Sequence, residues 1–304
     1  MMLGPRSARQ RAALAIAGAA LVACGVAGCG GEAGGRDGGL GDAGGFDGAA
    51  RDGAAGADAA ARDGAAGADA ATPVDASAGA ATVGAAALAQ RAYMQAPATG
   101  TLTTAAVTTR TGSTLLVSLA RGTWAAAPDA PTDGMSNGYA RVGDVHTYAS
   151  WPTSATALYQ KSNALGGAGH TFSMTWGDVG SGDEVTLSAV EVIGGGAVED
   201  ASWVERAAAS SLTSGSVHVS GKAVLVAWWW GSGGVRPVGS RHVAVPGGGF
   251  QVIPAATGLA SISSSGYVQV ASAWRLVTTP GDYTVTWTTD GEGAQLYLVA
   301  VQVP

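Results

Sequence analysis

Two pairs of segments in the C-terminal two thirds of the chain match each other without a gap. They are Gly112–Gly122 (GSTLLVSLARG) with Gly221–Gly231 (GKAVLVAWWWG), and Phe172–Val192 with Tyr283–Val303. Matches that recur in the same order at a nearly constant offset are typical of an internal duplication. The pattern predicts two units, at about residues 100–193 and 211–304. The second match places Trp176 and Trp287 at equivalent positions.

Each unit has the sequence pattern of many short β-strands. From Val83 onwards, short runs rich in Val, Thr, Leu and aromatic residues are broken by Gly, Pro, Asn and Asp. Only Ala85–Met94 has the composition of a helix. The near absence of helix favours antiparallel sandwiches over a βαβ fold. We therefore predict an all-β protein with two tandem antiparallel β-sandwich repeats, the first in residues 83–198 and the second in residues 199–304.

Several of these segments also resemble a known kind of repeat. They are GSTLLVSLARG, TDGMSNGYARV, TALYQKSNALGGAGHTFSMTW and EVTLSAVEVIGG. Together they look like the duplicated jelly-roll-like repeat of secreted bacterial and phage-tail-associated proteins, over most of residues 100–304. The resemblance implies a jelly-roll-like architecture and an extracellular setting. Its motifs carry no catalytic residues, so it implies no activity.

The N-terminus has the layout of a secretory signal, with basic residues followed by the uncharged apolar run Ala12–Gly28. At the end of this run, Val26–Cys29 resembles the lipobox of bacterial lipoproteins, in which the cysteine thiol receives diacylglycerol. The resemblance implies removal of residues 1–28 and lipidation of Cys29, in the bacterial cell envelope and most naturally at the outer membrane. Cys24 is a second candidate for the lipidated residue, and an ordinary signal peptide is the alternative.

Residues 29–82 are expected to form a disordered tether. They consist almost entirely of Gly, Ala and Asp and contain the 11-residue sequence ARDGAAGADAA twice. Such a segment cannot bury enough apolar surface to offset its ordering entropy. As a coil it would span roughly 40 Å. Calcium binding by its aspartates is the alternative, but the regular Gly-Gly-x-Gly-x-Asp period of repeat-type calcium sites is missing.

Charge and cysteine content exclude some classes of function. The formal net charge of −6 at pH 7 becomes more negative once the Arg-containing signal is removed. Nucleic-acid binding needs a basic surface, so we expect no nucleic-acid partner. Cys24 and Cys29 are the only cysteines. We therefore expect neither a disulfide nor a thiolate metal site in the mature protein.

The three consecutive tryptophans Trp228–Trp230 are the candidate ligand-binding feature. In a strand, Trp229 points away from Trp228 and Trp230. The first gapless match sets Trp228, Trp229 and Trp230 against Leu119, Ala120 and Arg121. This alignment predicts a buried Trp228, a more exposed Trp229 and a Trp230 at the rim. Trp229 and Trp230 could then bind a glycan or another planar partner. The alternative is that Trp229 packs against the other repeat or against residues 200–207.

A serine motif raises the possibility of an enzyme. Gly134–Gly138 (GMSNG) matches the Gly-x-Ser-x-Gly elbow of hydrolases, with Ser136 as the nucleophile. A strand-like segment follows it, so a β-turn explains the glycines better than a strand-to-helix elbow. A hydrolase would also need a histidine and a carboxylate near the Ser136 hydroxyl.

No metal site or cofactor is predicted. The histidines are His146, His170, His218 and His242, and none has the spacing of a zinc motif, although Asp144 and His146 share a face of an extended strand. The acidic residues Asp178, Asp183 and Glu184 lie in a Gly-rich loop. Solvated turn acids explain them, with calcium binding as the alternative.

These observations favour a lipid-anchored cell-surface binding or adhesion module without catalytic activity. Its expected partners are the membrane, through the N-terminal lipid, and a glycan or a cell-envelope protein. A structural envelope component that packs against other proteins is the second hypothesis. A secreted serine hydrolase that uses Ser136 is the third.

Overall fold

The computed structural model of the chain describes most of its C-terminal part. The described residues are 81–91, 100–122, 129–149, 151–176, 184–232, 244–259 and 268–304. All of them belong to one compact unit, Ala70–Pro304. The predicted signal, Cys24, Cys29 and almost all of the predicted tether lie outside them. Within the described residues, no helix is long and apolar enough to cross a membrane.

The predicted all-β fold is confirmed. Among the described residues, every regular element is a strand except the short 3-10 helix η1 (Pro254–Ala256), and every strand pairing is antiparallel. The residue runs rich in β-branched and aromatic side chains form the long strands, as their β propensity favours.

The first half of the described chain forms one large and one small sheet. The large sheet has the order β1-β8-β3-β6-β5, formed by β1 (Thr82–Arg91), β8 (Val185–Ile193), β3 (Thr114–Arg121), β6 (Trp151–Lys161) and β5 (Ala140–Tyr148). The small sheet has the order β2-β7-β4, formed by β2 (Gly100–Thr103), β7 (Phe172–Trp176) and β4 (Thr132–Asp133).

The second half has a corresponding pair of sheets. The large one has the order β14-β16-β12-β19-β9, with β14 (Gln251–Val252), β16 (Val268–Val277), β12 (Ala223–Ser232), β19 (Ala294–Gln302) and β9 (Val198–Arg206), and β15 (Gly258–Leu259) also pairs with β16. The small one has the order β10-β18-β13, with β10 (Ser211–Thr213), β18 (Thr286–Thr289) and β13 (Ala244–Pro246). Beside it, β11 (Val217–Val219) pairs with β17 (Gly281–Tyr283).

Five strands of each large sheet follow the same order, while β15 and the β11–β17 pair have no counterpart among the described strands of the first half. When the first large sheet is read from β1 and the second from β9, neighbouring strands are in both cases the first, fifth, second, fourth and third along the chain. The strands β7 and β18 are both the central strands of small sheets. Trp176 on β7 packs against the core of the first half, and Trp287 on β18 lies in the core of the second. The duplication itself stays a prediction.

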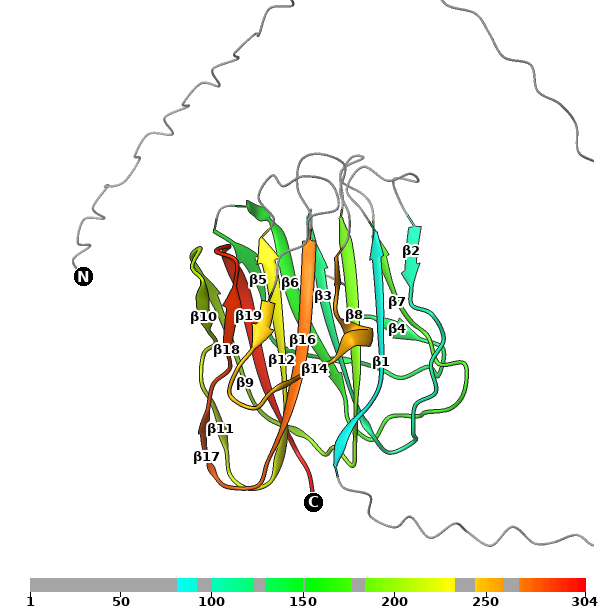
Figure 1. Ribbon diagram of the computed structural model, residues 1–304. Coiled ribbons are helices and arrows are strands. Elements are labelled where there is room, and N and C mark those ends of the chain that lie inside the picture. The colour runs from blue at the N-terminus through cyan, green and yellow to red at the C-terminus, as the bar shows by residue number, and fades with distance from the viewer. Residues whose placement is uncertain are drawn as a thin grey trace, which may run out of the picture. The chain divides into compact units, whose positions relative to one another are not determined.

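Three hydrophobic clusters separate the sheets into layers. One fills the space between the large and small sheets of the first half, and a second does the same in the second half. The third contains residues from both large sheets, which therefore pack face to face. Figure 1 shows β2, β4 and β7 on one side of this arrangement and β10, β18, β11 and β17 on the opposite side.

Two tryptophans connect the large sheets through hydrogen bonds. Trp228 Nε1 donates to Ser188 Oγ on β8 at 3.1 Å, and Trp230 Nε1 donates to Ser118 Oγ on β3 at 3.1 Å. All four side chains are fully buried. Each indole therefore fills apolar space in the third cluster and still pairs its single donor, which burial would otherwise leave unsatisfied at a cost.

Further contacts join the two large sheets at both edges of the interface between them. At the β5–β9 margin, the ring of His146 stacks on Trp203 with centroids 4.0 Å apart, and the carboxylate of Glu205 accepts hydrogen bonds from the Ala149 N–H. At the other margin, the Ala256 carbonyl of η1 accepts hydrogen bonds from the hydroxyls of Ser188 and Ser272.

The expected exposure of Trp229 and Trp230 is wrong. Both side chains are fully buried, as is Trp228, whose burial was predicted correctly. Trp229 belongs to the cluster inside the second half, together with Leu212 and Trp287. Since β12 lies inside a stack of layers, both of its faces are covered, and no face is left for a surface platform.

Strand pairing explains this error. Val117 pairs with Ala189, and Leu225 pairs with Ala300. The second sequence match sets Ala189 on Ala300, so the strand partners of these two alanines, Val117 and Leu225, occupy corresponding positions. The first gapless match had instead set Val117 on Val226. A shift of one residue moves every side chain of a strand to the opposite face. The faces of β3 and β12 that the alignment treated as equivalent therefore point into different clusters.

The predicted helix Ala85–Met94 is also wrong. Its described part, up to Arg91, belongs to β1, which pairs with β8 along its length. The side chains alternate, with Leu88 against the cluster between the large sheets and Ala87 inside the first half. The buried carboxylate of Glu191 on β8 also accepts a hydrogen bond from the Ala85 N–H at 2.9 Å. Pairing and burial override the helix propensity of alanine here.

Removal of either core indole should destabilise the protein to a similar degree. We expect Trp229→Ala and Trp228→Ala each to lower the free energy of unfolding by about 3 to 5 kcal/mol, because each removes a large buried aromatic group. Urea denaturation of the full chain measures this. Val252→Ala, at an exposed position on β14, serves as the control and should stay within about 0.5 kcal/mol of wild type. A Trp229→Ala variant as stable as this control would contradict the packing described.

Candidate functional site

The Ser136 motif forms a tight turn after β4. The Asp133 carboxylate Oδ1 accepts hydrogen bonds from the N–H groups of Met135 at 3.0 Å and Asn137 at 2.9 Å. Ser136 is exposed and has a positive φ of 59°, in the left-handed region that a turn of this kind uses. The local structure is thus the β-turn that the flanking sequence predicted.

Asp133 also contacts a histidine, as a hydrolase would require. Its Oδ2 accepts hydrogen bonds from Tyr139 Oη at 2.7 Å and Asn137 Nδ2 at 2.8 Å, and lies 2.9 Å from His170 Nε2. The other ring nitrogen of His170 lies 2.6 Å from Thr109 Oγ1. Both ring nitrogens are therefore engaged by groups other than Ser136.

Burial and hydrogen bonding set the ionisation of this cluster. Burial disfavours the charged form of Asp133, but the hydrogen bonds from Tyr139 and Asn137 and the nearby His170 outweigh it and hold the pKa of Asp133 below its ordinary value. Burial, together with the Asp133 carboxylate, raises the pKa of Tyr139 far above its ordinary value. The cluster pairs a neutral phenol with an ionised carboxylate across the turn, and the contact of Asp133 with His170 connects the turn to the segment just before β7.

The other residues singled out in the sequence do not come together as a metal site. Among the described residues, no group of three or more His, Cys, Asp or Glu side chains could hold a metal ion. His146 stacks on Trp203. His218 bonds to Asp282 at 2.8 Å on the surface, and this hydrogen bond raises the pKa of His218. Cys29, Asp178, Asp183 and His242 lie outside the described residues.

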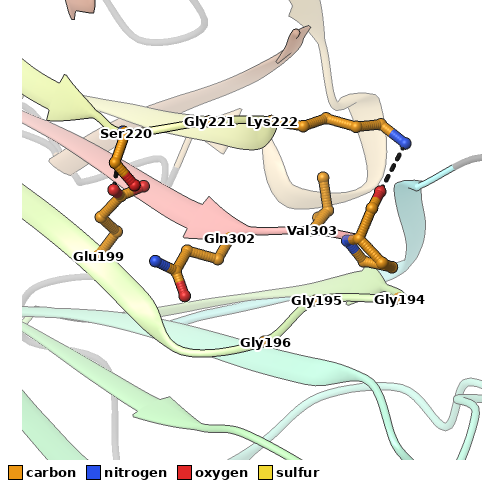
Figure 2. A pocket seen from close by; sticks show the side chains of 10 residues that line it. Gly194, Gly195, Gly196, Glu199, Ser220, Gly221, Lys222, Gln302 and Val303 are labelled. Carbon is orange, nitrogen blue, oxygen red and sulfur yellow. Dashed lines mark hydrogen bonds between the residues drawn. The ribbon is translucent and has the colours of Figure 1, made fainter. Parts of the chain in front are cut away.

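A pocket of about 410 Å³ lies where the two halves of the chain meet. Three separate segments line it, and Figure 2 shows their arrangement. They are the link between β8 and β9 with the start of β9 (Gly194, Gly195, Gly196 and Glu199), the turn before β12 (Ser220, Gly221 and Lys222), and the end of the described chain (Gln302, Val303 and Pro304).

The polar groups of the pocket include hydrogen-bond donors and acceptors. Glu199 Oε1 accepts a hydrogen bond from the Ser220 N–H at 2.7 Å, and Lys222 Nζ donates to the Pro304 carbonyl at 2.7 Å. Hydrogen bonds from Ser220, assisted by Gln302 and His218, outweigh burial and lower the pKa of Glu199. The Gln302 carboxamide extends into the space beside the Gly194–Gly196 segment (Figure 2).

The glycines of the β8–β9 link are required by close approach. Gly194 has a φ of +69°, and a Cβ on Gly195 would lie 3.0 Å from the Val192 carbonyl oxygen. Thr114 Oγ1 donates to the Gly196 carbonyl at 2.6 Å, and the Gly196 N–H donates to the Gln302 carbonyl at 2.7 Å. The glycines let the chain pass from one large sheet to the other while leaving the pocket open.

Sequence reasoning placed the boundary between the repeats at residues 198 and 199 but did not predict a site there. The run of three glycines at that boundary was the available signal, because a run of this kind marks a close backbone approach. The pocket side chains come from segments far apart in the sequence. Comparison with protein-family models, with curated proteins and with solved structures finds no match to this chain.

The Asp133 cluster predicts a specific pH dependence of stability. Since the folded-state pKa of Asp133 lies below its unfolded value of about 3.9, its ionised form stabilises the fold above about pH 4. That contribution is lost as the pH falls through the folded-state pKa. We expect wild type to be more stable than Asp133→Asn at neutral pH, with a difference that shrinks below about pH 4.

Urea denaturation of both proteins over a series of pH values measures this difference. Asp129→Asn, at an exposed carboxylate, is the matched control. A difference between wild type and Asp133→Asn that does not change with pH would contradict the assignment.

Proposed function

We propose that this chain is a lipid-anchored cell-surface binding or adhesion module of the bacterial envelope, without catalytic activity. The lipobox-like Val26–Cys29 and the Gly/Ala/Asp-rich residues that follow support the anchor and the tether. The layered β-structure supports a rigid carrier for a binding site, because such a scaffold holds its surface groups in fixed positions.

The pocket at the β8–β9 link is the candidate binding site. The observation that carries this part of the proposal is the convergence of a carboxylate, a carboxamide, an ammonium group and backbone groups from three segments on one open cavity. These groups offer both donors and acceptors and suit a ligand with several hydroxyl groups. A glycan of the cell surface or cell wall is therefore the proposed ligand class.

Two other functions are less well supported. A structural envelope component would need a large apolar contact surface, and the large exposed apolar side chains of the described residues are only Leu165, Val245 and Val252. A serine hydrolase would need His170 to reach Ser136, whereas its ring nitrogens contact Asp133 and Thr109. The net negative charge argues against nucleic acid as a partner.

Loss of the pocket side chains should weaken glycan binding without loss of the fold. On a glycan and cell-wall array, we expect Gln302→Ala in the detergent-solubilised full chain to weaken binding roughly tenfold, the effect of losing one or two hydrogen bonds to the ligand. Gln251→Ala, at an exposed position on β14 away from the pocket, is the matched control. Absence of any glycan binding by wild type, or equal binding by both variants, would count against the pocket.

Lipidation predicts where the protein partitions. We expect wild type to enter the detergent phase in a phase-separation assay and to carry the lipid on Cys29, so that Cys29→Ser moves the protein to the aqueous phase. Cys24→Ser is the control and should partition like wild type. Membrane association that survives Cys29→Ser, or a wild-type N-terminus of unmodified mass, would defeat the anchor proposal.

A further inference from the structure

A buried polar cluster lies between the two large sheets and is not part of the pocket or of the Ser136 turn. Thr156 comes from β6 of one large sheet, and Gln295 and Tyr297 come from β19 of the other. All three side chains are at most 2% exposed. Thr156 Oγ1 donates a hydrogen bond to Gln295 Oε1 and lies 3.1 Å from the Tyr297 hydroxyl. A hydroxyl group and a carboxamide are thus held in contact away from water.

The Gln295 carboxamide is only partly satisfied. Its Nε2 is buried and has no hydrogen-bond partner among the described residues. A buried donor without a partner destabilises the fold and calls for an explanation. Loss of this nitrogen from the protein would remove the cost.

A base shares the sheet face of Thr156. His146 is the direct cross-strand partner of Thr156 in the β5–β6 pairing, and directly paired residues point to the same face of a sheet. Its ring centroid lies 5.8 Å from that of Tyr297, whose hydroxyl contacts Thr156. Burial lowers the pKa of His146, although Asp144 opposes this effect, so the imidazole is neutral at neutral pH and able to accept a proton.

We propose that Thr156 and Gln295 react with each other to form an intramolecular ester. The hydroxyl oxygen of Thr156 attacks Cδ of Gln295, the Cδ–Nε2 bond breaks, and the hydroxyl proton ends on the departing nitrogen, which leaves as ammonia. The reaction is an acyl transfer without oxidation or reduction, so no further reactant is needed. Tyr297 and His146 are the groups placed to carry the proton from oxygen to nitrogen.

Position and burial both favour this reaction. Holding the two groups in contact replaces an encounter between molecules by a step within one molecule, which lowers the entropic part of the barrier. Exclusion of water also protects the ester from hydrolysis once it has formed. The bond would join β6 to β19 and so connect the two large sheets covalently, in a chain whose only cysteines are Cys24 and Cys29.

Peptide mapping by mass spectrometry tests the proposal on the full chain. Trypsin cleaves after Lys and Arg, so Thr156 lies in the peptide Val142–Lys161 and Gln295 in the peptide Leu276–Pro304. We expect the two peptides to be recovered joined, with a mass below their sum by one ammonia. Alkaline hydrolysis should separate them and leave Glu at position 295. Recovery from natively folded protein of two separate peptides with an intact Gln295 would overturn the proposal.

Substitutions of Thr156 and His146 distinguish a role in ester formation from a role in packing alone. Thr156→Ser keeps the hydroxyl and should still form the joined peptide, whereas Thr156→Val, nearly identical in shape, should give none while circular dichroism shows a native fold. A joined peptide in Thr156→Val would overturn the assignment of the nucleophile. His146→Asn should slow the appearance of the joined peptide in newly synthesised chain, sampled at successive times after synthesis, and an unchanged rate would overturn the role given to His146.

Discussion

The packing of the two large sheets against each other is the constraint on which the rest of the structure depends. Trp228 and Trp230 fill the space between the sheets, and their N–H groups bond to Ser188 and Ser118 of the opposite sheet. These bonds fix the position of one sheet on the other, because a shift would leave the two buried indole N–H groups without partners. The outer small sheets then cover the remaining faces, so the central strands are buried on both sides.

The burial of the central strands on both faces explains which predictions from the sequence succeeded and which failed. The short apolar runs and their Gly and Asn boundaries were enough to predict an all-β protein and the position of the strand that contains Trp229. They did not give its environment, because in a strand covered on both faces the alternation of polar and apolar residues disappears. The helix predicted at Ala85–Met94 failed for a related reason. Alanine favours a helix in isolation, but pairing with β8 decides the structure there.

The candidate sites depended on contacts that no local pattern contains. Asp133 and His170 meet because β4 and the region before β7 are neighbours, and the pocket combines the β8–β9 link with Lys222 and Gln302. Thr156 and Gln295 meet only because the two large sheets pack face to face. Each of these sites follows from the arrangement of the layers, whereas the predicted exposure of Trp229 rested on a repeat alignment that is one residue out of register between β3 and β12.

Native-state hydrogen exchange tests most directly whether the sheet interface makes the two halves one cooperative unit. The amides of β3 in the first large sheet and of β12 in the second should exchange only through global unfolding, with the same free energy of opening. Denaturant should lower both free energies with the same slope, because both strands become exposed in one event. Opening of β12 at a clearly lower free energy than β3, with a smaller dependence on denaturant, would contradict this account of the fold.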